Sequence, residues 1–324
     1  MTRADYVIRR IAFAFVTVIV AVTLNFVIFR AIPGDAVSAL RCERCTVQFK
    51  QELRRELGLN KSKLEQYWLY LKDLAHGDLG KSLLTQKPVT TELAEPIENT
   101  LPMVALGTLF AIIFGVLVGV ISAWRRGTAI DRVGQYTGLA FYSMAPQWLG
   151  LLMVLWVASA LGLPTAGVKD PVIGLLGNAS TWDIVNDRLR HMILPALTIG
   201  LVLYGEYALI VRSAMLETLG EDYVLTARAK GLHNWPIVWR HGLRNAMLPI
   251  ITLIALSLGF IIGGFITVEY VFSYPGIGLA IVQAIDQRDF PILQGAFLLL
   301  TMSVIFFNLI ADLLYFKFDP RVTL

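Results

Sequence analysis

The stretch Asp222–Pro249, DYVLTARAKGLHNWPIVWRHGLRNAMLP, is the most informative part of this chain. It is polar and basic, it is interrupted by Gly231 and Pro236, and apolar runs long enough to cross a bilayer lie on both sides of it. A short turn between two membrane helices needs no such segment. Two short helical pieces separated at a glycine would instead form a surface at the membrane face on which a soluble partner could dock.

The composition is that of a membrane protein. The chain is 56% hydrophobic and 16% charged, whereas soluble domains of this size are closer to a quarter charged. Backbone polar groups in lipid must be satisfied within the segment, and the alternation of a barrel strand is absent, so we expect helices. The sequence predicts an all-α integral membrane protein with six transmembrane helices, at Ile8–Phe29, Leu101–Trp124, Tyr136–Leu161, Met192–Met215, Leu248–Val271 and Pro291–Phe316.

The basic residues predict the orientation of these helices. The first apolar run is too long for a cleavable signal sequence, and no small-residue cleavage site follows it before Arg30. Six spans would place the basic segments on one side, so both termini are predicted to be cytoplasmic. The net charge of +4 then reflects topology, which argues against nucleic-acid binding. The residues concerned are Arg3, Arg9, Arg10, Arg125, Arg126, Arg132, Arg228, Lys230, Arg240, Arg244, Lys317 and Arg321.

The long segment 33–100 is then predicted to be extracytoplasmic and to hold two amphipathic helices. The first would begin after a cap at Thr46 and end at Gly58. The segment either covers helix ends at the outer mouth of the bundle or has a gating or docking role. The second helix is indicated by apolar residues at helical spacing, which are Leu64, Tyr67, Trp68, Leu71 and Leu74.

The run Gly77-Asp-Leu-Gly-Lys-Ser82 invites a nucleotide-binding interpretation, but its spacing is wrong. A phosphate-binding loop requires a glycine five residues before Gly80, where this chain has Ala75. No buried parallel strand precedes the run, and the topology places it outside the cytoplasm. We predict a turn here, and any ATP hydrolysis would come from another chain.

The two cysteines, Cys42 and Cys45, form a C-x-x-C in the outer segment. Two thiols supply half of a tetrahedral metal site, and a redox motif of the thioredoxin kind needs a βαβ context that is missing. A local disulfide, free thiols, and a metal or redox function are the alternatives, of which the disulfide is favoured. The four histidines show no ligand spacing, so we expect no metal site and no catalytic site in this chain.

Ionisable residues within the predicted spans are candidates for a translocation path. Glu206 and Arg212 lie in the fourth span, and Glu269 lies near the outer end of the fifth. Such residues usually face a bundle interior or a water-filled path. Because Glu206 and Arg212 are six residues apart, they are not a favoured pair on one helix. The alternative for each carboxylate is a hydrogen-bonded structural role.

Several motifs carry a resemblance to a known family. They are Asp222-Tyr-Val-Leu-Thr-Ala-Arg-Ala-Lys-Gly-Leu232, Arg240-His-Gly-Leu-Arg-Asn-Ala-Met-Leu-Pro249, Glu269-Tyr-Val-Phe-Ser-Tyr-Pro-Gly-Ile-Gly278, Asn308-Leu-Ile-Ala-Asp-Leu-Leu-Tyr315 and Asp319-Pro-Arg321. The chain resembles the B-type permease subunit of the dipeptide, oligopeptide and nickel branch of ATP-binding-cassette importers. The resemblance covers nearly the whole chain. It implies one permease domain over residues 1–324 with the fold of type I importers.

The resemblance implies that residues 216–246 form the cytoplasmic coupling loop, whose short helix sits in a cleft of the ATPase. In such importers the loop carries the motif E-A-A…G…I-x-L-P. When this chain is aligned on Gly231, the E-A-A positions hold Leu225-Thr-Ala227, so the acid of the motif is absent. The I-x-L-P positions hold His241-Gly-Leu-Arg244. Trp235, Ile237 and Val238 would supply an apolar surface for the partner, the alternative being a helix lying on lipid. The candidate coupling residues are Asp222, Ala227, Gly231, Leu232, Trp235 and Pro236.

The implied function is peptide import by alternating access in the bacterial plasma membrane. The expected partners are a second homologous permease, two cytoplasmic ATP-binding subunits or domains, an extracytoplasmic peptide-binding protein and membrane lipid. ATP and Mg²⁺ would be bound by those ATP-binding partners, with no cofactor in this chain. The alternatives are a nickel or other small-solute importer, a stand-alone secondary carrier, which would need inverted repeats and an acidic relay, and a membrane receptor or scaffold.

Overall fold

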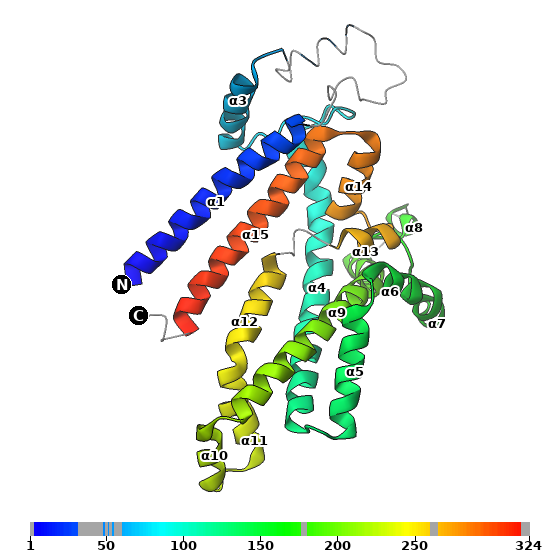
Figure 1. The fold of residues 1–324 in the computed structure, drawn as a ribbon. Helices are drawn as coiled ribbons and strands as arrows, with labels where there is room; N and C mark the ends of the chain where they lie inside the picture. Colours follow the sequence, from blue (N-terminus) through cyan, green and yellow to red (C-terminus); the bar gives the residue numbers. More distant parts are fainter. Residues whose placement is uncertain are drawn as a thin grey trace.

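The computed structural model describes residues 3–31, 60–175, 180–259 and 265–318, together with the single residues 48, 51 and 54. This part of the chain is helical and contains no β-strand (Figure 1). Its elements are α1 (Arg3–Ala31), α3 (Lys63–Ala75), α4 (Val89–Trp124), α5 (Ala129–Ser143), α6 (Pro146–Leu152), the π-helix η1 (Met153–Ala158), α7 (Ser159–Leu161), α8 (Pro171–Leu175), α9 (Thr181–Leu219), α10 (Asp222–Ala229), α11 (Asn234–Pro236), the π-helix η2 (Ile237–Leu243), α12 (Arg244–Gly259), α13 (Ile266–Val271), α14 (Ile277–Gln287) and α15 (Phe290–Phe318).

Four helices in the described part are long and apolar enough to cross a membrane by themselves, within α1, α4, α9 and α15. The predicted third span is not one straight helix, because the chain bends by 106° between α5 and α6. Met144 and Ala145 are extended at this bend, as residues before Pro146 tend to be. The predicted fifth span comprises α12 and α13, with residues 260–264 outside the description. The membrane fold is confirmed, whereas the number of six spans stays a prediction.

Helices α4 and α9 form the centre of the molecule, and small residues let them pack closely. Residues of α4 at every fourth position are Gly107, Ala111, Gly115, Gly119 and Ala123, and all of these are buried. A Cβ at Gly107 would lie 2.7 Å from a backbone oxygen of α9, and one at Gly119 would lie 2.7 Å from a side chain of α9. Without a hydrophobic drive between helices in lipid, such close packing is a main source of association.

The second predicted helix of the outer segment is confirmed as α3, which Ser62 caps with its side chain. Its predicted apolar face is partly wrong, because Leu64 is 70% exposed and Trp68 is 64% exposed. Tyr67 instead shares a 2.7 Å hydrogen bond with Thr23 of α1, and the ring of Tyr70 stacks on Phe26. The predicted helix between Thr46 and Gly58, and the cysteine pair, lie outside the described residues.

The turn predicted at residues 77–82 is confirmed. Gly77 and Gly80 both have positive φ angles, and the Asp78 carboxylate accepts a hydrogen bond from the Gly80 amide at 2.8 Å. The segment then pairs with the start of α4 through a single bridge between Lys81 and Pro88. It therefore links α3 to α4 as a compact turn.

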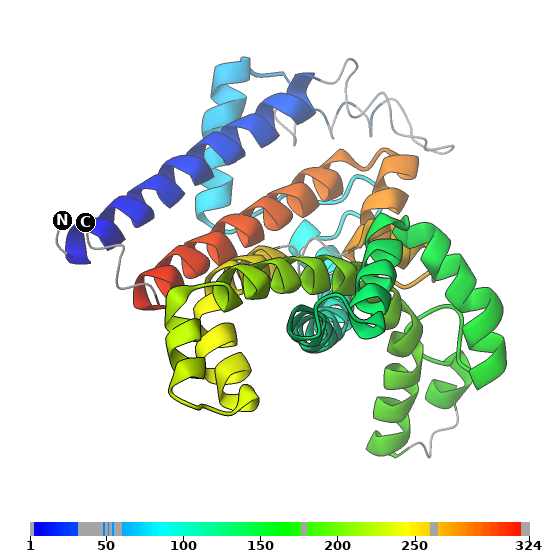
Figure 2. The same ribbon diagram turned by 60° about the horizontal axis from the view of Figure 1, so that its bottom comes forward.

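The two ends of the molecule are built differently. Helices α3 and α14 lie at one end, which we call the outer end, while α10, α11 and the turn between α4 and α5 lie at the opposite, inner end (Figure 1). Turning the molecule so that its bottom comes forward shows α10 and the segment from α11 to α12 side by side (Figure 2). An ion pair of 3.0 Å between Arg10 and Asp312 joins α1 to α15.

Candidate functional site

The segment Asp222–Leu243 folds into a helical hairpin at the inner end, which we call the inner hairpin. Helix α10 begins at Asp222, and Gly231 follows it with φ of +76°, a conformation that favours glycine. No atom lies within 4 Å of a Cβ placed at this glycine, so its backbone conformation is the constraint there. His233 is extended, and Pro236 lies in the first turn of the returning helix, as predicted.

A small apolar core holds the two arms of the inner hairpin together. Val224 and Ala227 of α10 pack with Ile237 of the returning arm, and all three are buried. Val238 is also buried, against the inner ends of α4 and α9. The prediction that Ile237 and Val238 face a partner is therefore wrong. Ala227, a candidate coupling residue, lies in the core of the hairpin, where it positions the arms.

Large apolar side chains nevertheless remain exposed on the inner hairpin. Trp235 is 66% exposed and packs beside Trp239, with 5.2 Å between the ring centroids. Leu225 and Leu232 are 55% and 43% exposed, and Tyr223 is 38% exposed. We call these four the inner apolar surface. A cluster of exposed aromatic and aliphatic side chains at one end of a molecule is typical of a site that a partner covers, and tryptophan is a frequent anchor of such sites.

The inner hairpin is fastened to the two central helices. A Cβ at Gly242 would lie 3.0 Å from Met215 and 3.2 Å from Leu219, so η2 packs directly on the end of α9. The Arg228 guanidinium lies 6.0 Å from the ring centroid of Trp124, the last residue of α4. Because α4 and α9 pack so closely on each other, a displacement of the inner hairpin would move them together.

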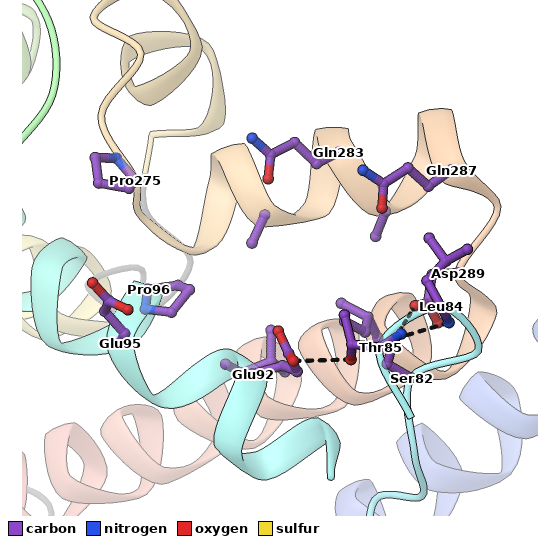
Figure 3. A pocket seen from close by; sticks show the side chains of 14 residues that line it. Ser82, Leu84, Thr85, Glu92, Glu95, Pro96, Pro275, Gln283, Gln287 and Asp289 are labelled. Carbon is purple, nitrogen blue, oxygen red and sulfur yellow. Dashed lines mark hydrogen bonds between the residues drawn. The ribbon is translucent and has the colours of Figure 1, made fainter. Parts of the chain in front are cut away.

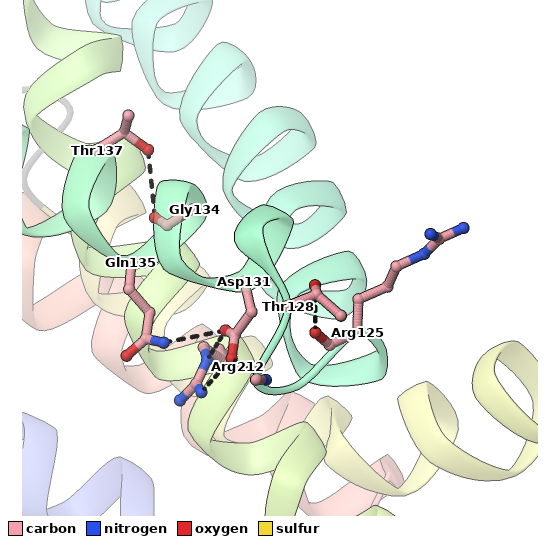
Figure 4. A network of polar contacts seen from close by, with 8 residues as sticks. Arg125, Thr128, Asp131, Gly134, Gln135, Thr137 and Arg212 are labelled. Carbon is pink, nitrogen blue, oxygen red and sulfur yellow. Dashed lines mark hydrogen bonds and ion pairs between the residues drawn. The ribbon is translucent and has the colours of Figure 1, made fainter.

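A buried ion pair ties the α4–α5 turn to α9 (Figure 4). The Arg212 guanidinium donates two hydrogen bonds to Asp131, from Nε at 2.7 Å and from Nη2 at 3.0 Å. Asp131 also accepts bonds from the Gly127 amide and the Gln135 side chain, at 2.9 Å and 3.0 Å. Such bidentate pairs are geometrically specific. Arg212, a candidate path residue, is thus engaged by Asp131, which the sequence analysis missed although it is an acid in the first turn of an apolar helix.

Glu269, a second candidate path residue, is fully buried in a joint at the outer end. Its carboxylate accepts hydrogen bonds from Thr100 Oγ1 at 2.8 Å and from the amides of Gly278 and Leu279 at 2.7 and 3.1 Å. It therefore caps the N-terminus of α14 and joins that helix to α4. A Cβ at Gly278 would lie 2.6 Å from the Ile266 Cα and 3.0 Å from the same carboxylate, so the close approach of α13 requires a glycine there. The structure places Glu269 in the hydrogen-bonded structural role.

The other end of α14 is held by a second buried carboxylate. Asp289 accepts hydrogen bonds from Ser82 Oγ at 2.5 Å and from the Leu83 amide at 3.2 Å. Together with α14 and the start of α4, this segment borders a hollow of about 290 Å³ (Figure 3). The polar residues of its lining are Ser82, Thr85, Glu92, Glu95, Gln283, Gln287 and Asp289. The remaining lining residues are apolar, so this hollow is of mixed polarity.

Glu206 differs from the two other candidate path residues. It is half-buried in the middle of α9, and within the described residues no hydrogen bond or ion pair to its carboxylate is recorded. Glu206, Arg212 and Glu269 are not brought together, because Arg212 bonds to α5 and Glu269 bonds to α4 and α14. The hydrogen-bonded structural role therefore has support for Glu269 and none for Glu206.

The long apolar helices and the fold place the chain in the class of membrane-embedded proteins with the fold of type I ATP-binding-cassette importer permeases. Among solved structures, the methionine transporter MetNI in an inward-facing conformation matches with a TM-score of 0.55 at 19% identity, covering 70% of this chain and 96% of that one. The chain belongs to the family described as binding-protein-dependent transport system inner membrane component, which matches residues 115–324, with the N-terminal model of that family matching residues 1–103.

Several transport permeases are similar to this chain over almost their entire length. The dipeptide transport system permease protein DppB of Escherichia coli K12 is 36% identical, and a di/tripeptide permease of Pseudomonas aeruginosa is 37% identical, each match covering 98% of both chains. The glutathione transport system permease protein GsiC of Pectobacterium atrosepticum is 35% identical with the same coverage. The family predicted from the motifs is therefore confirmed.

Proposed function

We propose that this chain is one of the two permease subunits of an ATP-driven importer of short peptides. The observation that carries this proposal is its similarity to dipeptide permeases over 98% of both chains, at 35–37% identity. Peptides of two or three residues are the substrates in the names of these relatives. Glutathione, itself a tripeptide, is the second candidate, because the glutathione permeases are 34–35% identical.

The chain supplies half of the translocation path and has no covalent chemistry of its own. ATP and Mg²⁺ are bound and ATP is hydrolysed in two partner subunits, one of which docks on the inner hairpin. The exposed Trp235 and Leu232 support this docking, since they would be covered by the partner. Asp222, Gly231 and Pro236 shape the hairpin that presents them. Motion of the ATPase then reaches α4 and α9 through η2.

The membrane orientation is part of the proposal. The inner hairpin and both termini face the cytoplasm, and α3, α14 and the hollow beside α14 face the outside of a bacterial plasma membrane, where a peptide-binding protein delivers substrate. The distribution of Arg and Lys supports this orientation. A cysteine at Lys63 should react with an impermeant maleimide in intact cells, and a cysteine at Arg126 should not; the reverse pattern would contradict it.

Transport by the reconstituted complex tests the function directly. This chain, the second permease, the ATPase subunits and the binding protein are placed in proteoliposomes, and uptake of radiolabelled dialanine, glutathione and Ni²⁺ is measured with and without ATP. We expect ATP-dependent uptake of dialanine, and no ATPase activity from the purified permease alone. Uptake of Ni²⁺ without uptake of either peptide would overturn the proposal in favour of a metal importer.

A further inference from the structure

The middle of α9 is held by three other helices. Gly205 packs against the backbone of Gly138 in α5, and a side chain at Gly115 of α4 would collide with Tyr207. The Tyr207 hydroxyl donates a 2.9 Å hydrogen bond to Ser257 of α12. Gly205 and Tyr207, the residues on either side of Glu206, therefore both contact other helices of the chain.

Glu206 lies between these two residues on α9 and is only partly buried. Successive residues of an α-helix are separated by about 100°, so Glu206 is turned away from both Gly205 and Tyr207. Ser213 and Glu217 lie on the same face two and three turns later, and both are exposed. This face of α9 is therefore exposed toward the inner end and partly exposed at Glu206 in the middle of the helix.

A carboxylate in this place needs a positive partner. An uncompensated charge within a membrane span is costly, and such groups generally pair or line an aqueous path. The cation nearest in sequence on α9 is Arg212, which is already engaged by both oxygens of Asp131. Among the described residues no ion pair to Glu206 is found, so its carboxylate is available to a cation that comes from outside this part of the chain.

We propose that Glu206 is the subsite in this half of the translocation path that binds the free α-ammonium group of a peptide in transit. The inference rests on the proposed peptide function. Every peptide with a free amino terminus carries this group, whatever its side chains are. A single carboxylate between the apolar residues Val202 and Leu209 would therefore hold any such peptide by charge, without selecting its side chains. A metal ion would need further ligands, and no group of three or more His, Cys, Asp or Glu suited to one is found in the described residues.

Photolabelling of the assembled complex tests this subsite. Both permeases and the ATPase subunits are purified without the binding protein, so that recognition by that protein cannot contribute. The probe is a dipeptide with a diazirine side chain and a free amino terminus. We expect excess dialanine to suppress labelling of this chain, whereas N-acetyl-dialanine, which lacks the ammonium charge, should compete about tenfold less well.

Variants separate the subsite from a general effect on the helix. Glu206→Gln should lower labelling about tenfold, and Glu206→Asp should keep most of it because the charge remains. The matched control is Glu217→Gln, which removes an exposed carboxylate from the same face three turns away and should label normally. The amount of assembled complex is measured by size-exclusion chromatography for each variant.

Three results would overturn the inference. These are equal competition by dialanine and N-acetyl-dialanine, unchanged labelling of Glu206→Gln, and loss of the second permease from the Glu206→Gln complex, which would place the counter-charge in that subunit. If the wild-type complex imports dialanine and one of these results is found, the ammonium subsite alone fails. If the wild-type complex imports no peptide, the proposed function fails.

Discussion

The outer and inner ends of this permease differ in whether their notable side chains find partners within the chain. At the outer end, the buried carboxylates of Glu269 and Asp289 are fully engaged by groups of the same chain, and they hold both ends of α14. At the inner end, Trp235, Leu225 and Leu232 are left exposed to solvent. The polar groups of the outer joint are therefore satisfied within the chain, whereas the inner hairpin keeps large apolar side chains exposed, as expected if the proposed partner covers them.

The difference agrees with the proposed roles of the two ends. If the inner hairpin binds a soluble partner, its apolar side chains must stay exposed in the free subunit. If the outer end receives substrate, buried hydrogen bonds would hold its shape, because they are costly to break. Substitutions at the outer end should therefore change the stability of the subunit, and those at the inner end should change partner binding.

The largest effect is expected at the outer joint. Glu269→Ala leaves the amides of Gly278 and Leu279 without their acceptor, and the free energy of unfolding should fall by about 3 kcal/mol or more. The measurement is thermal unfolding of the complex in detergent. Glu98→Ala, an exposed acid of α4 near the same joint, is the control and should unfold like the wild type. Equal melting temperatures for the two variants would show that the hydrogen bonds of Glu269 do not stabilise the outer end.

Substitution in the inner apolar surface should weaken partner binding and leave the stability of the permease unchanged. Trp235→Glu places a charge in the proposed contact, so co-purification of the ATPase subunits should weaken by about 2 kcal/mol while the permease unfolds normally. Trp182→Glu changes a tryptophan that is 71% exposed at the other end of α9 and is the matched control. If both variants bind the ATPase subunits equally, the inner hairpin is not the docking site.

A smaller loss of stability is expected at the second outer anchor. Asp289→Asn retains one acceptor oxygen for either Ser82 or Leu83, so the free energy of unfolding should fall by about 1–2 kcal/mol. The same thermal assay measures this loss. Asp286→Asn alters an exposed residue of α14 and should have no measurable effect, so a similar shift in both would show that the hydrogen bonds are not its cause.

The smallest effect is expected at Gly231, where the two arms of the inner hairpin meet. Gly231→Ala forces a side chain into a φ of +76°, with a strain of about 1 kcal/mol that should weaken ATPase binding a few-fold. Gly220→Ala, where φ is −84°, is the control and should bind normally. Binding titrations of the ATPase subunits to the two variants decide the matter. A normal affinity for Gly231→Ala would show that the backbone conformation there is not important for docking.

Several features of this protein are readable from local sequence, because they depend on nearby residues. Apolar runs with few charges predict α1, α4, α9 and α15 as membrane helices, since the backbone in lipid must bond to itself. Gly231 and Pro236 predict the break and the return of the inner hairpin, because each restricts its own backbone. The family motifs determine the class of protein, and the comparisons with relatives confirm it.

Other features were decided only by the tertiary structure, because they join residues distant in the chain. The sequence indicates Arg212 and Glu269 as candidates for the translocation path. In the structure Arg212 bonds to Asp131, 81 positions away, and Glu269 accepts a hydrogen bond from Thr100, 169 positions away. Ile237 and Trp235 are two positions apart, but packing on α10 buries the first and leaves the second exposed. Hydropathy reports whether a side chain prefers to avoid water, and only the packed fold determines which apolar side chains find partners within the chain.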